Sequence, residues 1–218
     1  MKYLSLLWAN LGRKRLRTSL TLASIVIAFL LFGMLQTLTS ALTGSVNLAG
    51  ADRLMTMHKV SLIQPLPSSY TNRVRSVAGV TEVSAQDWFG GIYQDDRNQI
   101  AAMAVEAEPF IRMYPEYPLT QQERADWLAT RTGAIVGKVI AERFKWKVGD
   151  TIPLRSNIFT QADGSNVWEL KISAIYDATN GDNQSIYFHH EYLNESRVEG
   201  KDTVGMLGIR ITDPERES

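Results

Sequence analysis

Residues 20–35 read LTLASIVIAFLLFGML, and the longer stretch from Thr18 to Ala51 contains no charged side chain. A helix crosses the hydrocarbon core of a bilayer with about 20 apolar residues, so this stretch is long and apolar enough for a membrane span. The sequence holds no second stretch of this kind. We therefore expect one transmembrane helix near the N-terminus, followed by a water-soluble domain.

Basic side chains precede this stretch and set the expected orientation. Residues 1–17 contain five basic residues and no acidic one, whereas the rest of the chain is net acidic. Because positive charges beside a span stay on the cytoplasmic side, we expect the N-terminus in the cytoplasm and the main domain outside it. The acidic balance of that domain argues against a nucleic-acid partner. The predicted topology residues are Arg13, Lys14, Arg15 and Arg17.

Cysteine is absent, which excludes disulfides and thiolate metal sites. An external domain without disulfides is typical of a bacterial periplasm or cell surface, so we expect the bacterial inner (cell) membrane. A cleaved signal peptide is the alternative, since Ala49-Gly50-Ala51 follows the apolar run. The run exceeds the ~7 to 15 residues of a signal core, so we favour an uncleaved anchor.

The span is flanked by two amphipathic patterns. Residues 1–17 form the predicted cytoplasmic segment, where Tyr3 and Trp8 belong to a regular apolar stripe that favours a helix on the lipid surface over a disordered tail. Residues 18–48 are the predicted transmembrane and stalk helix, with an apolar stripe that continues beyond the bilayer. Such a stripe needs a packing partner, either another helix or a second copy of the chain. Its members are Leu35, Leu38, Leu42 and Val46.

Residues 49–218 are the predicted periplasmic domain, of the α+β class. Alternating or short apolar runs bounded by Gly, Pro and Asp predict strands. A capping box, Thr120-Gln-Gln-Glu123, predicts the start of a helix that ends near Thr130. The other predicted helices cover 69–76 and 138–144, and the predicted strands cover 54–60, 80–85, 100–105, 134–136, 151–154, 167–176, 186–188 and 204–211.

No catalytic, cofactor or metal site is predicted. The segment from Gly133 to Lys138 lacks the four-residue spacing and the Ser or Thr of a phosphate-binding loop. His189 and His190 would point to opposite faces of a strand, so they could not bind one metal ion together. No Gly-x-Ser-x-Gly elbow occurs. We therefore expect that the chain is not an enzyme, and that any ATPase is a separate subunit.

Two aromatic groups could form a contact surface. Trp88 and Phe89 precede a Gly-Gly pair, and the others surround two prolines, which suggests exposed loops. Aromatic residues are enriched at interfaces, but they also anchor cores and loops, so both interpretations stay open. The candidate contact residues are Trp88, Phe89, Phe110, Tyr114 and Tyr117.

Several passages together resemble one family. The opening LGRKRLRTSLTLASIVIAF resembles the first membrane segment of MacB-type, FtsX-like permeases, the membrane subunits of ABC transporters. The passage GAIVGKVIAERFKWKVGDTIPL, Gly133 to Leu154, is similar to a strand, helix and strand of their periplasmic core domain. Residues 79–85 are similar to an earlier helix-to-strand passage of that domain. Phe29, Leu30 and Leu31 stand where such spans often carry glycines.

The resemblance implies a dimeric permease of the mechanotransmission kind. A cytoplasmic ABC ATPase subunit would drive motion of the periplasmic domains for export or extraction of a substrate. The expected partners are that ATPase, a second permease copy or a related permease, membrane lipid and a periplasmic adaptor. Such permeases continue with three more spans, so we expect this chain to be the N-terminal part with an incomplete periplasmic domain.

Two other functions remain open at this stage. One is a single-span anchored periplasmic binding or scaffold domain without energy coupling. The other is an anchored periplasmic hydrolase, which would need a nucleophile and a base within hydrogen-bond distance.

Overall fold

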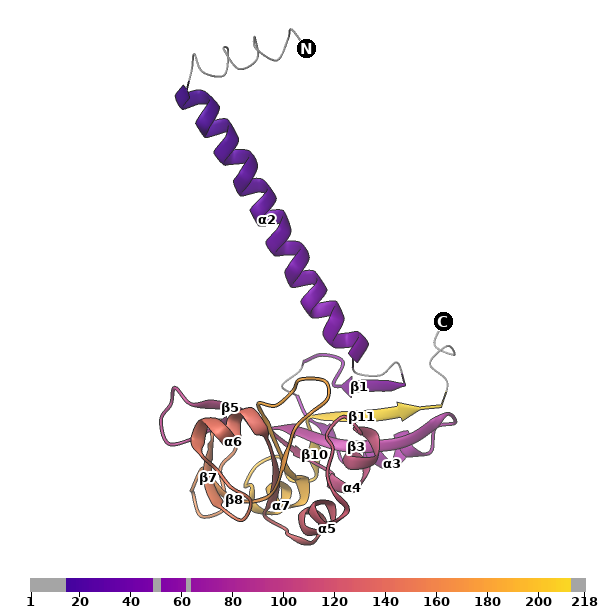
Figure 1. Ribbon diagram of the computed structural model, residues 1–218. Helices are drawn as coiled ribbons and strands as arrows, with labels where there is room; N and C mark the ends of the chain where they lie inside the picture. The colour runs from indigo at the N-terminus through magenta and orange to yellow at the C-terminus, as the bar shows by residue number, and fades with distance from the viewer. Residues whose placement is uncertain (1–14, 49–51, 62–63, 213–218) are drawn as a thin grey trace. The chain divides into compact units, whose positions relative to one another are not determined.

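The computed structural model describes residues 15–48, 52–61 and 64–212, with side chains described only to residue 40 in the first range. The chain divides into two compact units, Met1–Gly50 and Ala51–Ser218. The first unit contains the helix α2 (Arg15–Leu48). The second is a mixed domain of strands and short helices (Figure 1).

Helix α2 has the properties of a membrane span. Its segment Arg15–Ser40 is long and apolar enough to cross a bilayer, and none of it is buried within the protein. Hydroxyl groups on the helix form hydrogen bonds with carbonyls of the preceding turn. Thr21 and Thr37 donate to the carbonyls of Arg17 and Gly33 at 2.9 and 2.8 Å. Such back-bonding hides the hydroxyls from an apolar environment.

The second unit is built on a nine-stranded sheet in the order β1-β11-β3-β5-β4-β7-β8-β6-β9. The strand Thr151–Ser156 alternates between exposed and buried residues, as expected for a half-buried strand, whereas Gly133–Gly137 is buried at every position. The bounds of the strands are β1 (Arg53–Met57), β3 (Val80–Trp88), β4 (Gly91–Ile92), β5 (Gln99–Val105), β6 (Gly133–Gly137), β7 (Thr151–Ser156), β8 (Val167–Tyr176), β9 (Ser185–His189) and β11 (Met206–Ile211). A small second sheet joins β2 (Leu66–Pro67) to β10 (Thr203–Val204).

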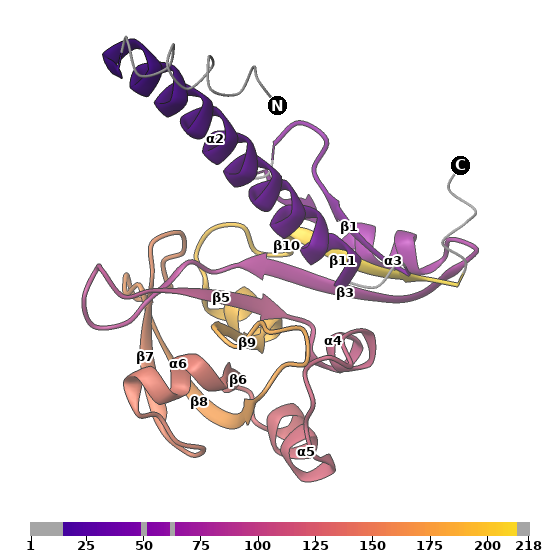
Figure 2. The same ribbon diagram turned by 45° about the horizontal axis from the view of Figure 1, so that its top comes forward.

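One end of the large sheet closes on itself. Strand β9 pairs antiparallel with β6 and parallel with β5, with Ala101 opposite Ser185 and Val105 opposite His189. The strands β4, β5, β9, β6, β8 and β7 therefore form a ring, while β3, β11 and β1 extend from it side by side (Figure 2). The ring encloses a core that includes Phe89, Trp168 and Phe188.

Five short helices cover the sheet and the ring. They are α3 (Ser69–Arg75), α4 (Ala107–Met113), α5 (Gln121–Ala129), α6 (Lys138–Phe144) and α7 (His190–Ser196). Helix α4 shares a second apolar cluster with Trp127 of α5 and Tyr176 of β8. Helix α3 places Val74 on a third cluster, which also contains Val83 and Leu207.

The predicted α+β class, with one apolar helix before it, is confirmed. The capping box is also present, because Thr120 accepts from the Glu123 amide while the Glu123 carboxylate accepts from the Thr120 amide. Two helices were not predicted. Pro109 falls in the first turn of α4, where its missing N–H does no harm, and α7 follows β9 with no turn residue between them. Strand β1 ends at Met57 instead of residue 60.

Gly137 lies where β6 passes into α6, and no side chain fits there. A Cβ atom at this position would lie 2.3 Å from the carbonyl carbon and oxygen of Asn183. That same carbonyl accepts from the amides of Val139 and Ile140, at 3.1 and 3.3 Å, so it satisfies the first turn of α6.

We expect Gly137→Ala to destabilise the domain by about 3 kcal/mol or more, because the backbone of Asn183 would have to move and release α6. Thermal unfolding of the full chain in detergent, followed by tryptophan fluorescence, measures the effect. The control is Gly164→Ala, where φ is +86° but nothing lies within 4 Å. Its cost should be about 1 kcal/mol, from backbone strain alone. An equal loss of stability in the two variants would contradict the close approach of the Asn183 backbone to Gly137.

Candidate functional site

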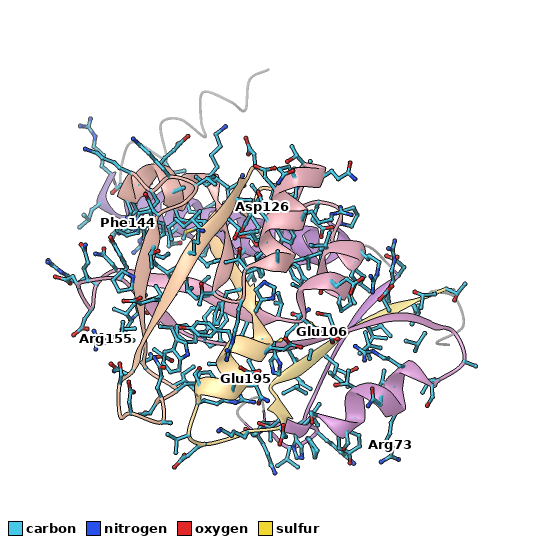
Figure 3. The ribbon with its side chains drawn as sticks, turned by 90° about the horizontal axis from the view of Figure 1, so that it is seen from below. Arg73, Glu106, Asp126, Phe144, Arg155 and Glu195 are labelled. Atoms are coloured by element: carbon cyan, nitrogen blue, oxygen red, sulfur yellow. The ribbon has the colours of Figure 1, made fainter. Side chains whose placement is uncertain are left out.

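A polar groove of about 460 Å³ lies between α3, α4 and the start of α7. We call it the α3–α4 groove. Most of its lining can donate or accept hydrogen bonds, whereas small-molecule pockets are mostly apolar, so it resembles a contact surface more than a ligand cavity. Figure 3 shows Glu106 well inside the outline of the domain, whereas Arg73 projects outward from α3. Its polar lining includes Asn72, Arg75, Glu106, Glu108 and His190.

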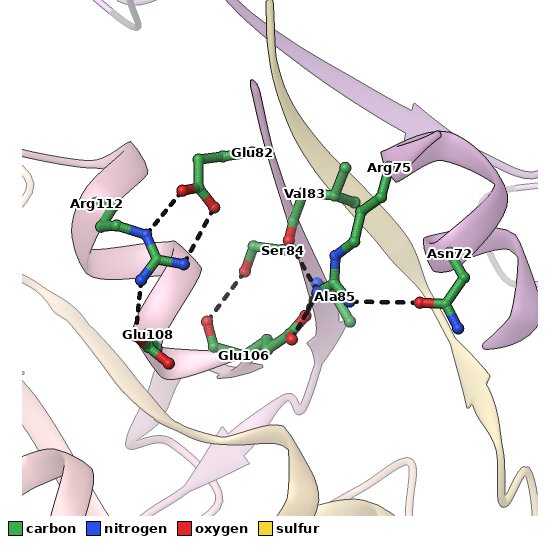
Figure 4. A network of polar contacts seen from close by, with 9 residues as sticks. All are labelled: Asn72, Arg75, Glu82, Val83, Ser84, Ala85, Glu106, Glu108 and Arg112. Atoms are coloured by element: carbon green, nitrogen blue, oxygen red, sulfur yellow. Dashed lines mark hydrogen bonds and ion pairs between the residues drawn. The ribbon is translucent and has the colours of Figure 1, made fainter. Parts of the chain in front are cut away.

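Glu106 occupies the place where β5 separates from β3. Its amide donates to the Ala85 carbonyl at 2.9 Å, which is the last backbone rung before α4 begins. The Ser84 hydroxyl donates to the Glu106 carbonyl at 3.3 Å. From this point the edge of β3 is covered by side chains, not by a neighbouring strand (Figure 4).

Arg75 joins α3 to this edge. One guanidinium nitrogen contacts both carboxylate oxygens of Glu106, at 2.6 and 2.8 Å, and approaches the Val83 carbonyl at 3.4 Å. Arg75 also contacts the Asn72 side chain at 3.4 Å. Because both charged groups are about 40% exposed, at 42% and 38%, water screens the pair and its contribution to stability is small.

Arg112 forms a second pairing on the α4 side of the groove. Its guanidinium donates to Glu82 on β3 at 2.7 Å and to Glu108, one turn earlier, at 2.8 Å. The hydrogen bond to Glu82 is the main cause of a raised pKa for Arg112. Figure 4 shows the two arginines on opposite sides of β3, so both flanking helices are fastened to one strand.

Beneath the groove lies a buried charged cluster of Asp87, His190 and Arg197. The Asp87 carboxylate is 3.0 Å from His190 Nε2 and 3.3 Å from the Arg197 guanidinium, and it accepts from the Gly205 amide at 2.6 Å. The contact with His190 is a close approach without hydrogen-bond alignment. Burial lowers the pKa of Arg197, since the apolar surroundings disfavour its charge.

We expect Arg197→Met to destabilise the domain by about 3 kcal/mol or more, because Asp87 would lose its buried cationic partner. Arg210→Met is the matched control, since Arg210 bonds Asp52 at 2.6 Å on a more exposed surface. That variant should lose less than about 1 kcal/mol. Urea unfolding of the full chain in detergent measures both, and equal losses would show that Asp87 does not depend on Arg197.

His189, at the end of β9, lies next to this cluster in sequence but has a different role. Its Nε2 is 2.8 Å from the Trp127 carbonyl, and its ring lies against the Trp127 indole. Burial is the main cause of a lowered pKa for His189, so the folded domain favours the neutral ring. Nε2 then carries the proton and donates to the carbonyl.

We expect the stability of the domain to decrease as the pH falls below about 6.5, the ordinary pKa of histidine in an unfolded chain. Below that value the unfolded chain binds a proton at His189 more readily than the folded chain does, so stability is lost toward lower pH. Thermal unfolding between pH 7.5 and 5 measures the trend. His189→Gln, which cannot titrate, should lose less stability at low pH than the unchanged protein. If the variant shows the same dependence of stability on pH, His189 is not the cause of the loss.

The structure corrects part of the predicted contact surface. Phe89 and Phe110 are 0% and 2% exposed, so they belong to the core and cannot contact a partner. Tyr114 and Tyr117 are partly buried against Phe110, with ring centroids 4.6 and 5.7 Å from it. Trp88 is 48% exposed and lies on the surface. Pro115 and Pro118 are exposed in the irregular segment after α4, but Tyr114 and Tyr117 in the same segment pack against the core.

The predicted membrane and stalk residues are only partly described. Tyr3, Trp8, Arg13 and Lys14 lie outside the described residues. Arg15 and Arg17 are exposed at the start of α2. Leu35 and Leu38 are exposed on the same helix. Leu42 and Val46 lie within α2, but their side chains are outside the description.

The groove residues were not found from the sequence. Arg75 and Glu106 are 31 positions apart, and Glu82 and Arg112 are 30 apart, so no local spacing marks them. Among the described residues, no group of three His, Cys, Asp or Glu side chains could hold a metal ion. His190 faces a carboxylate, His189 a carbonyl, and His58 accepts from the Val60 amide.

Comparison with known proteins identifies the family. The model of the MacB-like periplasmic core domain matches residues 18–217, which is nearly the whole chain. The chain belongs to the MacB-like periplasmic core domain family. It therefore carries an extracytoplasmic domain of an ABC transporter permease, next to a helix suited to anchor it in a membrane. A search of curated proteins gave no significant match.

One of the similar solved structures, the first described here, supports the MacB-like fold. The periplasmic region of MacB from Actinobacillus actinomycetemcomitans is 10% identical, with a TM-score of 0.51 over 75% of this chain and 76% of that one. The extracellular domain of the noncanonic ABC-type transporter YknZ from Gram-positive bacteria is 11% identical, with a TM-score of 0.48 over 75% and 84% of the two chains. A domain of a putative permease protein from Porphyromonas gingivalis is 12% identical, with a TM-score of 0.45 over 68% and 64%.

Proposed function

We propose that this chain is the N-terminal part of an ABC transporter permease of the mechanotransmission type. ATP hydrolysis on a separate cytoplasmic subunit would move the spans and, through them, the periplasmic domains, for export or extraction of a substrate. The observation that carries the proposal is the match to the MacB-like family over residues 18–217, which takes in the apolar helix together with the domain. The chain itself would not be an enzyme.

The proposed arrangement in the membrane follows from charge and length. Residues 1–17 lie on the cytoplasmic side of the bacterial inner membrane, and residues 18–48 form the span and stalk. Residues 49–218 form the periplasmic domain. Arg15 and Arg17, exposed at the start of α2, support this orientation because cationic side chains beside a span stay cytoplasmic. Leu35 and Leu38, exposed on α2, would pack against a partner helix.

Motion of the helix would reach the domain through its first strand. Residue 48 ends α2 and residue 53 begins β1, so only four residues connect the two. Because few residues separate them along the chain, we expect a displacement of α2 to enter the domain at β1. Strand β1 is hydrogen-bonded to β11 along its whole length, so the displacement enters the sheet directly.

The α3–α4 groove and Trp88 are the proposed contact sites for a periplasmic adaptor. The groove offers paired charges on a half-open surface, and Trp88 offers an exposed aromatic side chain of the kind that anchors protein interfaces. Trp88→Ala should weaken adaptor binding at least tenfold if this side chain is such an anchor.

We expect the protein, expressed in bacterial membranes with the rest of its permease, to co-purify with an ABC ATPase subunit. Pull-down from detergent-solubilised membranes followed by mass spectrometry measures this. A matched preparation lacking residues 1–48 should recover no ATPase. Recovery of a monomer without any ATPase would favour an anchored scaffold domain instead.

The orientation has a separate test. A periplasm-active reporter fused after Ile211 should be active, and the same reporter fused after Arg17 should be inactive, since α2 separates the two positions across the membrane. Alkaline phosphatase activity in whole cells measures both fusions. Activity of both fusions, or of neither, would contradict a single crossing between them.

A further inference from the structure

One face of the nine-stranded sheet is rich in methionine. Met57 of β1 lies opposite Met206 of β11, and Met206 lies opposite Gln86 of β3. Trp88, two residues after Gln86, lies opposite Met103 of β5. Side chains that lie opposite each other, or two residues apart on one strand, point to the same side of a sheet. The methionines of this face are Met55, Met57, Met103 and Met206.

Three of these residues form a compact group, Met55, Met57 and Met206, which we call the methionine group. The Ile211 amide donates to the Asp52 carbonyl at 2.8 Å, and hydrogen-bonded pairs alternate along an antiparallel ladder. Met57 and Met206 are therefore a non-hydrogen-bonded pair, in which the Cα atoms lie about 4.5 Å apart. Met55 is the diagonal neighbour of Met206, at about 7 Å, which long side chains can span. The three sulfur atoms can therefore meet at one point above the sheet.

The methionine group is not part of the core. Methionine often fills gaps between packed side chains, but none of these three residues belongs to the three apolar clusters of the described domain. Met55 and Met57 are 50% and 37% exposed. The gap nearest to them is already filled, because the sulfur of Met113 lies 3.4 Å from where a Cβ atom of Gly208 would be, opposite Met55. Packing of the domain therefore does not require three methionines at these positions.

The charges beside the methionine group compensate each other. Arg53 lies opposite Arg210 on the same face, two residues before Met55. Arg53 is paired with Glu116 and Arg210 with Asp52, each at 2.6 Å. A cation bound by the methionine group would therefore not face an uncompensated positive charge from these arginines.

We propose that Met55, Met57 and Met206 bind a soft monovalent metal ion, Cu(I) or Ag(I), through their thioether sulfurs. Thioether sulfur is a soft ligand that selects Cu(I), whereas oxygen ligands suit hard ions such as Mg²⁺. The sulfurs are uncharged, so they would leave the charge of a divalent ion uncompensated. Because the chain has no cysteine, thioethers are its only sulfur ligands.

The proposed metal site joins two strands that are far apart in the sequence. Met55 and Met57 belong to β1, whereas Met206 belongs to β11. A bound ion would therefore hold the end of β1 to β11 and stabilise the folded domain relative to the unfolded chain. None of the three ligands belongs to α2, so the site does not depend on the proposed energy coupling.

Titration with silver nitrate tests the site, because Ag(I) is soft and monovalent and needs no reductant. Isothermal titration calorimetry of the full chain in detergent and chloride-free buffer should show a single silver ion bound per chain. Met57→Leu removes one sulfur but keeps the size of the side chain, so binding should weaken at least tenfold while the melting temperature without metal stays the same. Met103→Leu is the matched control, since Met103 shares the face but lies outside the methionine group, and its silver affinity should not change.

Nuclear magnetic resonance of the methionine methyl groups identifies the ligands independently of affinity. With the methionines labelled with carbon-13 at the ε-methyl group, silver should shift the signals of Met55, Met57 and Met206 and leave that of Met103 in place. Cu(I), kept reduced with ascorbate, should shift the same three signals. Zn²⁺ should shift none of them, since it prefers nitrogen, oxygen and thiolate ligands.

The outcomes separate the metal site from the proposed function. Absence of silver binding, or equal affinity in Met57→Leu and the unchanged protein, would overturn the site even if the ATPase co-purifies. Loss of binding in His58→Gln together with unmoved methionine signals would assign the ion to the imidazole after β1 and overturn the site as well. Methionine-dependent binding without co-purification of an ATPase would support the site and count against energy coupling.

Discussion

The parallel pairing of β9 with β5 is the constraint on which the domain depends. Strand β5 runs beside β3 and β4 on one side and beside β9 on the other, so it belongs to both the ring and the open part of the sheet. The pairing brings residues more than 80 positions apart into register. It closes the ring around the aromatic core and leaves β1 as the outer strand.

The ring also explains where charge is tolerated inside the domain. Asp87 lies on β3 at the point where the ring meets the open sheet, and Arg197 reaches it from the segment after α7. Arg197 also donates to the Thr203 carbonyl at 2.6 Å, so the segment carrying β10 is held to β3 by a charged group. Apolar packing alone would leave the carboxylate uncompensated at this junction.

The sequence predicted the elements whose signals are local. The apolar run of α2, the capping box of α5 and most strands were found because spacing, caps and turn residues lie within a few positions of one another. The groove was not found, since Arg75 meets Glu106 only after the sheet has formed. The prediction that Phe89 and Phe110 belong to an exposed contact surface was wrong for a related reason. Their exposure depends on which distant residues pack over them, and both are buried.

The pairing of β1 with β11 has a mechanical consequence. Under the proposed function, a pull from α2 would arrive at Arg53, the first residue of a strand that is paired with β11 at all five of its positions. Tension directed along that strand would load all the β1–β11 hydrogen bonds together in shear, and the sheet would move as a unit. Tension directed across the strand would break these hydrogen bonds one after another. If the proposed function holds, the direction in which the helix moves would decide whether the domain moves as a unit or β1 separates from β11.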